Sequence, residues 1–400
     1  MAQIINTRSP FYIKVSDSSL ATATLKLYIY EGVKDTSPDA ADLKYTITKS
    51  ELEANNQVVF EISELIRDYI DVKYDGEYDS YCVWANAVIT AENSSGSSIS
   101  SPTVTPSDYT NQFVAVEGYG YFEEGVNPEP SRSLLQSNSI IYRPNDGNIS
   151  IPIFAENTNS VAYYNNGTLI RSEIISDNDN TNQKIQYISV SGENDDNENI
   201  TAATYEERVL EDGGTLESSR CLEQFLSYLD ISEVDEIVVG YDTDAGSAAH
   251  IIKVRNFDCS IYDPIRVTFV NKYGALQDLW FDKKSMNSIN AESNDYKASV
   301  MDFSSTPTYD TSAHQNRVLD LVGKESITMN TGYIDELFNE VFRQLMLSEQ
   351  VWMTRLTDTE EVLPLRPKTQ SLQFKTRTND KLVNYTVEFD FAFDKINTIR

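Results

Sequence analysis

The last strand-like segment of this 400-residue chain limits its fold more than any other feature. From Val383 to Phe393, large side chains occupy every second position, with smaller or polar residues between them. Side chains of a β-strand point alternately to opposite faces, so this period of two predicts a long strand with one apolar face. That face needs a second sheet, a helix or a neighbouring subunit to cover it, and its six side chains are Val383, Tyr385, Val387, Phe389, Phe391 and Phe393.

A helical pattern precedes this strand. Between Thr331 and Ser348, apolar residues recur at i, i+3, i+4, i+7, i+8 and i+11, which predicts an amphipathic helix with a continuous apolar stripe. Thr331 can cap its N-terminus, and Asp335 and Glu336 complement the helix dipole. We expect this unit to mediate assembly, and the candidate interface residues are Ile334, Leu337, Phe338, Val341, Phe342 and Leu345 of the helix with Phe389, Phe391 and Phe393 of the strand.

Short strands separated by turn signals extend over the rest of the chain. Residues 24–30 alternate between apolar and more polar positions, which is typical of a half-buried strand. Asn166-Gly167 supplies the positive φ angles of a type I′ turn and predicts a hairpin between 161–164 and 168–171. The 24 Tyr and 16 Phe favour strands as well. The expected fold is mainly β, with tandem fibronectin- or immunoglobulin-like sandwiches.

The length requires more than one hydrophobic core. Proline-containing junctions divide the chain into an N-terminal β-sandwich (1–125), a second β-rich domain (126–262) and a C-terminal assembly domain (263–400). A short helix is expected at 217–229. In the last domain we expect strands at 265–270, 276–281, 351–356 and 371–377, the last of these forming a hairpin with the final strand. Residues 285–320 are weakly patterned and are expected to form a long arm.

The charge balance limits the partners. With 62 acidic and 32 basic residues the net charge is −30, which disfavours nucleic acid and anionic membranes and favours partners with basic surfaces. No apolar run approaches the roughly 20 residues that span a bilayer. The N-terminal residues lack a secretory-signal pattern, so synthesis in a cytoplasm is expected. Three scattered cysteines, Cys82, Cys221 and Cys259, indicate neither a disulfide framework nor a zinc site.

Residues with catalytic chemistry are sparse. The chain has two histidines, His250 and His314, and no nucleophile elbow, P-loop or HExxH pattern. We therefore expect no enzymatic activity, no catalytic residues and no cofactor. The acidic tracts 176–182 and 192–199 invite comparison with calcium loops. The first has oxygen ligands at alternate positions but lacks the glycine and the distal glutamate of an EF-hand, so an exposed acidic loop is the better interpretation.

A second class of function stays open. The tyrosine-rich segments 119–122 and 163–164 carry aromatic side chains that could stack on sugar rings. If they are exposed, the chain would be a carbohydrate-binding or adhesin-like surface protein built of tandem sandwiches. Aromatic residues in strands more often pack against a neighbouring sheet.

Several segments together resemble a known group of proteins. These are 8–12 (Arg-Ser-Pro-Phe-Tyr), 60–70, 257–262, 265–281 and 385–400. They resemble virion proteins encoded in the tail modules of bacteriophages of Bacteroidetes-type hosts. The resemblance implies a structural tail or baseplate component, located in the virion and present in several copies in a homo-oligomeric ring. Its partners would be other tail proteins, whose parts it would link or whose fibres it would anchor. The C-terminal hairpin and helix resemble tail-tube and baseplate folds, and no catalytic residues are implied.

Overall fold

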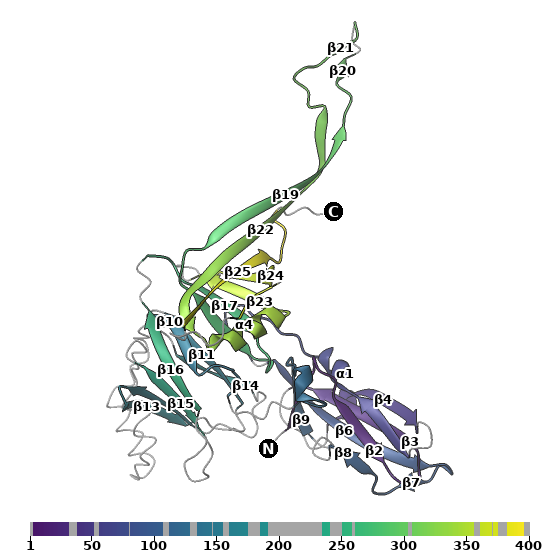
Figure 1. Ribbon diagram of the computed structural model, residues 1–400. Coiled ribbons are helices and arrows are strands. Elements are labelled where there is room, and N and C mark those ends of the chain that lie inside the picture. Colours follow the sequence, from purple (N-terminus) through teal and green to yellow (C-terminus); the bar gives the residue numbers. More distant parts are fainter. Residues whose placement is uncertain are drawn as a thin grey trace, which may run out of the picture.

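The fold of the chain is mainly β, and its strands form several separate sheets (Figure 1). The computed structural model describes residues 3–31, 38–51, 56–79, 81–106, 112–128, 134–145, 147–154, 160–174, 185–190, 234–240, 250–257, 261–302, 306–355, 361–369, 371–374 and 382–395. Each sheet lies within one of the ranges 1–125, 126–262 and 263–400. We call these the N-terminal, second and third domains.

The N-terminal domain packs two sheets face to face. The larger has the order β1 (Gln3–Asn6), β9 (Gln112–Val116), β6 (Cys82–Asn93), β3 (Leu20–Tyr30) and β4 (Leu43–Ser50), with β7 (Ser98–Ile99) on β6. The smaller has the order β5 (Gln57–Glu61), β2 (Tyr12–Ser16) and β8 (Thr103–Thr105). The predicted alternation is confirmed, because Leu25, Leu27 and Ile29 of β3 are buried in the core between the sheets. Helix α1 (Ser63–Arg67) and the 3-10 turns η1 (Ala40–Asp42) and η3 (Phe122–Glu124) complete the domain.

The second domain has a five-stranded and a two-stranded sheet. Their orders are β10 (Ile140–Pro144), β16 (His250–Phe257), β15 (Glu236–Gly240), β12 (Ser160–Asn165), β13 (Thr168–Ile174), and β11 (Ile149–Phe154) with β14 (Ile185–Val190). The predicted hairpin is confirmed: β12 pairs with β13, and Asn166 and Gly167 have φ angles of 48° and 77°. The predicted helix 217–229 and both acidic tracts lie outside the described residues.

The third domain is built on a seven-stranded sheet. Its order is β18 (Leu276–Phe281), β17 (Ile265–Val270), β23 (Val351–Arg355), β24 (Val362–Pro367), β25 (Leu382–Phe391), β22 (Asn316–Asp335) and β19 (Met286–Lys297). Helix α4 (Phe338–Leu347) lies on one face, and β20 (Met301–Asp302) pairs with β21 (Thr308–Tyr309) farther out. In Figure 1 the β19–β22 ribbon points away from the two other domains.

The predicted helix 331–348 is wrong in its first turns. Strand β22 continues to Asp335, and α4 begins only at Phe338. Tyr333, Ile334 and Asp335 pair with Asn384, Val383 and Leu382 of β25, after an irregularity at Gly332, whose φ is 68°. Pairing with a long neighbouring strand therefore overrides the local helical pattern. Thr331 does not cap the helix, which begins without a side-chain cap; the Thr331 hydroxyl donates to the carbonyl of Gly332 at 3.0 Å.

The predicted strand 371–377 is wrong over its first four residues. Residues 371–374 form no strand, 375–377 lie outside the described residues, and β25 pairs with β24 and β22. Strand β24 contains Pro364 and Pro367, which argue against a strand when only the sequence is read. Leu365 of this strand is nevertheless buried in the core. The predicted turn at 378–381 lies outside the described residues.

Helix α4 covers the apolar face of β25. The ring centroids of Phe342 and Tyr385 lie 4.6 Å apart, and the ring of Phe281 on β18 lies 6.5 Å from that of Phe342. Phe338, Val341 and Leu345 are buried in the same core as Val383, Val387 and Phe389. The sequence allowed a second sheet, a helix or a neighbouring subunit to cover the apolar face of β25, and the structure shows that helix α4 covers it.

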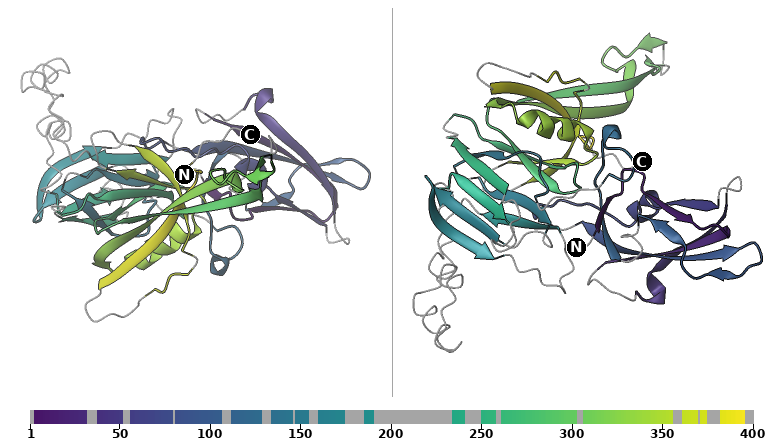
Figure 2. Two further views of the ribbon diagram at one scale, coloured as in Figure 1. Left: turned by 90° about the horizontal axis from the view of Figure 1, so that it is seen from above. Right: turned by 60° about the horizontal axis from the view of Figure 1, so that its bottom comes forward.

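All three domains meet at the turn between β17 and β18. The Tyr119 backbone N donates to the carbonyl of Lys272 at 2.8 Å, and the Asn271 side chain donates to the carbonyl of Leu135 at 2.7 Å. In the second domain, the Tyr187 hydroxyl accepts a bond from the Leu276 backbone N at 2.9 Å. An apolar cluster joins the same parts (Ile4, Tyr30, Trp84, Val114, Val116, Leu135, Phe154, Ile185, Tyr273 and Ala275). Figure 2 shows the other two domains on different sides of the third.

Gly274 lies in the turn where the three domains meet, and a side chain at this position would clash with the N-terminal domain. Its φ is 73°, and an added Cβ would lie 2.8 Å from the backbone N of Gly118 and 2.9 Å from that of Glu117. We expect Gly274→Ala to destabilise the protein by more than about 1 kcal/mol, because both the φ angle and the space are unfavourable. Gly96→Ala is the control, since Gly96 has a φ of 75° but no atom near the added Cβ. Urea denaturation compares them, and equal effects would contradict a role for close packing at Gly274.

Ion pairs tie the N-terminal domain to the end of α4. Arg8 donates to the carbonyl of Leu347 at 3.1 Å, where helix carbonyls lack intrahelical partners. The Glu349 carboxylate forms ion pairs with Arg8 at 3.1 Å and with Arg67 at 2.7 Å. Arg67 also bonds Glu117 at 2.7 Å, and these contacts raise the pKa of the Arg67 guanidinium. Several charges thus form a connected network between the domains.

Candidate assembly surface

The outer part of the β19–β22 ribbon is exposed to solvent. All residues of the 12-residue strand β19 are exposed, and β19 is the end strand of its sheet. Strand β25 reaches β22 only from Ser326 onward, so the ribbon beyond that point is two-stranded except where the Lys395 backbone N donates to the carbonyl of Gly323. A two-stranded ribbon is marginally stable in water by itself, and a long open edge can pair with another strand.

Apolar side chains lie on both faces of this ribbon. Met286 and Tyr296 of β19 are an even number of residues apart and share one face, while Ile289 lies on the other with Leu321 of β22. Leu319 is 73% exposed beside the irregularity at Asn294. Exposed apolar groups of this number on one element mark an interaction surface. The full set along the ribbon and its end is Met286, Ile289, Tyr296, Met301, Tyr309, Val318, Leu319 and Leu321.

The base of the ribbon is firmly fixed to the third domain. Ser326 pairs with Asp390 of β25, and the hydroxyls of Ser288 and Ser326 lie 2.8 Å apart across the ribbon. Lys395 forms an ion pair with Glu325 at 3.2 Å. The ribbon therefore leaves the domain in a direction set by the sheet.

The interface residues predicted from the sequence lie mostly in the core. Ile334 is buried on β22 instead of on the helix, and Phe338, Val341, Phe342, Leu345 and Phe389 are buried around α4. Phe391 is half-buried. Two of the candidates are exposed: Leu337 before α4 and Phe393 beyond the end of β25. The structure brings the helix and the last strand together, but around an intramolecular core.

Sequence reasoning missed the apolar residues of the ribbon. Isolated residues such as Met286, Ile289 and Tyr296 stand between Asn, Ser and Asp in a segment without clear periodicity. The available signal was a row of large side chains in a polar segment between two clear elements. That signal indicates an exposed arm, as expected for 285–320, but not its strands.

The tyrosine-rich segments are largely packed. Tyr119 and Tyr163 are buried, and burial raises the pKa of the Tyr119 hydroxyl to about 12. The Tyr121 ring has the Lys272 Nζ 4.4 Å from its centroid, and its hydroxyl donates to Glu340 at 2.6 Å. In 119–122, only Phe122 presents a fully exposed ring.

The two histidines lie in different domains of the described structure. His250 lies at the start of β16 and His314 near the end of the ribbon. Among the residues that the structure describes, no group of three or more His, Cys, Asp or Glu side chains could hold a metal ion. Within the same part of the chain, no helix is long and apolar enough to span a membrane.

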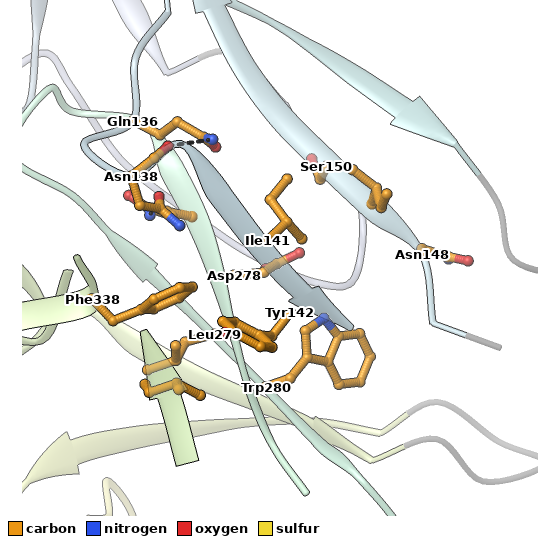
Figure 3. Close-up of a pocket in the computed structure, with 13 residues that line it drawn as sticks. Gln136, Asn138, Ile141, Tyr142, Asn148, Ser150, Asp278, Leu279, Trp280 and Phe338 are labelled. Atoms are coloured by element: carbon orange, nitrogen blue, oxygen red, sulfur yellow. Dashed lines mark hydrogen bonds between the residues drawn. The ribbon is translucent and has the colours of Figure 1, made fainter. Parts of the chain in front are cut away.

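A small cavity lies between the second and third domains. Ile141, Tyr142 and Ser150 line it from β10 and β11, opposite Asp278 and Trp280 of β18 (Figure 3). Its volume of about 20 Å³ has room for a single water and none for a substrate. The Ser150 hydroxyl is buried and has no hydrogen-bond partner in the described structure, so it can form a hydrogen bond with such a water.

A buried charged cluster borders this cavity. Thr268 donates to Asp278 Oδ1 at 2.7 Å, and the Tyr78 hydroxyl donates to Oδ2. The Arg266 guanidinium lies about 6 Å from the ring centroids of both Tyr78 and Trp280 (6.0 and 5.9 Å). Burial raises the pKa of the Asp278 carboxyl, while Arg266 and the two hydrogen bonds act in the opposite direction. Because Tyr78 belongs to the N-terminal domain, the cluster joins two domains.

No protein-family model matches the sequence, and no curated protein is significantly similar to it.

Proposed function

We propose that the chain is a non-catalytic structural protein that assembles with copies of itself through the β19–β22 ribbon. The observation that carries this proposal is a rigidly based ribbon with apolar side chains exposed on both faces and an open edge strand. When another subunit covers the ribbon, apolar surface is removed from water, and the unpaired backbone N–H and C=O groups along the edge of β19 can form hydrogen bonds. A self-assembling protein of this kind would be a ring-forming component of a bacteriophage tail or baseplate, which links tail parts or anchors fibres in the virion.

The arrangement of the domains supports an assembly role. The helix and the last strand already cover each other, while a row of large apolar side chains along the ribbon stays exposed and available to a neighbour. The three domains are locked at one junction, which would let a ribbon contact orient the whole subunit. The net charge of −30 favours other tail proteins with basic surfaces as further partners.

Shortening the ribbon tests this proposal. Ile289 and Glu325 are direct partners, so residues 290–324 can be replaced by Asn-Gly, which closes a two-residue hairpin. We expect the full chain to form oligomers or rings in sedimentation and negative-stain images, and the shortened chain to be a folded monomer. In the full chain, Leu321→Ser should weaken assembly. Val88→Ser is its control, because both side chains are 41% exposed. A full chain that stays monomeric at all concentrations would refute the proposal.

A further inference from the structure

The segment 121–127, which we call the knob, presents two apolar side chains to solvent. Phe122 is 98% exposed and Val126 is 73% exposed. Glu123, between them in the sequence, is exposed as well. Phenylalanine is usually buried, and aromatic anchors dominate the binding energy of many interfaces. The knob therefore has the composition of an interface anchor with an acidic neighbour.

The knob is held rigidly from both sides. The Tyr121 backbone N donates to Glu124 Oε2 at 2.9 Å, and Glu124 forms an ion pair with Lys272 of the third domain. At the other end, the Asn127 side chain accepts from the Tyr12 backbone N at 2.7 Å and donates to the Tyr12 carbonyl at 2.9 Å. A side chain on such a fixed turn loses little conformational entropy when it enters a partner.

A matching hollow lies at the far end of the ribbon. Its volume is about 400 Å³, and it is a shallow depression that is open to solvent, because most of the residues that line it are exposed. Arg317 gives it a positive charge, and the Arg317 Nε donates to the His314 carbonyl at 3.2 Å. The nearby Asp310 carboxylate is turned back onto Ser312, whose hydroxyl and backbone N bond it at 2.6 and 3.0 Å. The hollow is lined by Ala313, His314, Asn316, Arg317 and Val318.

We propose that the Phe122 knob of one copy seats in the arm-tip hollow of the next copy, with Glu123 against Arg317. Copies of a chain with a net charge of −30 repel each other, so a contact that places a basic group against an acidic one is favoured over other contacts. The knob and the hollow supply that pair, and the exposed Phe122 ring can lie against Val318 and Ala313 in the open hollow. They are different surfaces of one subunit, so the contact runs head to tail and generates a ring or a filament. This inference rests on the proposed function.

Exchanging the charges of Glu123 and Arg317 tests whether these residues meet between subunits. Glu123→Lys and Arg317→Glu each place like charges together, and we expect each variant alone to associate at least tenfold more weakly in sedimentation experiments. Mixing the two variants restores association, because the new lysine on the knob of one variant then meets the new glutamate in the hollow of the other. The reciprocal contact in the mixture is that of the unchanged chain. Glu64→Lys on α1, the same charge change at another exposed position, should leave association unchanged. Phe122→Ser should weaken association without altering thermal unfolding.

The outcomes separate this inference from the proposal on which it rests. If Phe122→Ser and Arg317→Glu assemble as the unchanged chain does, or if mixing restores nothing, the knob contact is refuted while ribbon-mediated assembly stands. If the unchanged chain is monomeric at every concentration, both are refuted.

Discussion

Phe342→Ala is expected to lower the free energy of unfolding by about 3–5 kcal/mol, the range for removing a phenylalanine from a packed core. Phe342 is fully buried, with its ring against Tyr385 and Phe281. The loss combines the transfer of its apolar atoms with the cavity that remains under α4. Urea denaturation followed by circular dichroism measures the change.

The control for Phe342 lies just before the same helix. Leu337 is 54% exposed, so Leu337→Ala should change stability by no more than about 0.5 kcal/mol. If the helix stripe were instead an interface between subunits, Phe342→Ala would weaken assembly and leave the stability of the dissociated monomer nearly unchanged. That result would contradict the core position of the stripe.

Arg266→Met is expected to destabilise the protein by about 3–5 kcal/mol at neutral pH, because it removes the buried positive charge that lowers the pKa of Asp278 and leaves the buried carboxylate uncompensated. Arg266 is buried, and its loss leaves the Asp278 carboxylate with only the hydroxyls of Thr268 and Tyr78. The matched control is Arg366→Met. Arg366 faces Asp390 at 3.9 Å but its side chain is 77% exposed, so a change below about 1 kcal/mol is expected.

The pH dependence of the Arg266 effect has a definite sign. Burial already raises the pKa of Asp278 in the folded protein, so the ionised carboxylate opposes folding more as pH rises through that pKa. Without Arg266 the pKa rises further. The destabilisation by Arg266→Met should therefore be larger at pH 7 than at about pH 5. A destabilisation that grows on acidification would show that Asp278 is not the group affected.

Local patterns in the sequence predicted most of the strands correctly. Residues 24–30, 265–270 and 276–281 are strands as their composition indicates, and Asn166-Gly167 forms the expected turn. These predictions depend on the period of two and on positive φ angles, which neighbouring residues largely determine. The mainly β class follows from the same patterns. The place where β22 ends and α4 begins could not be predicted, because the pairing partner, β25, is about fifty residues away.

The position of the proposed assembly surface could not be predicted from local patterns in the sequence. The helix stripe and the ribbon both contain large apolar residues, and the sequence cannot tell which of them the chain itself covers. The sequence by itself determined that the chain is mainly β, strongly acidic, and ends in an apolar strand near a helix. Only the tertiary structure decided that α4 covers that strand while the ribbon stays exposed. The reason is that burial depends on which distant segments pack together, and this is settled by the sheet order and not by the spacing of residues within any one segment.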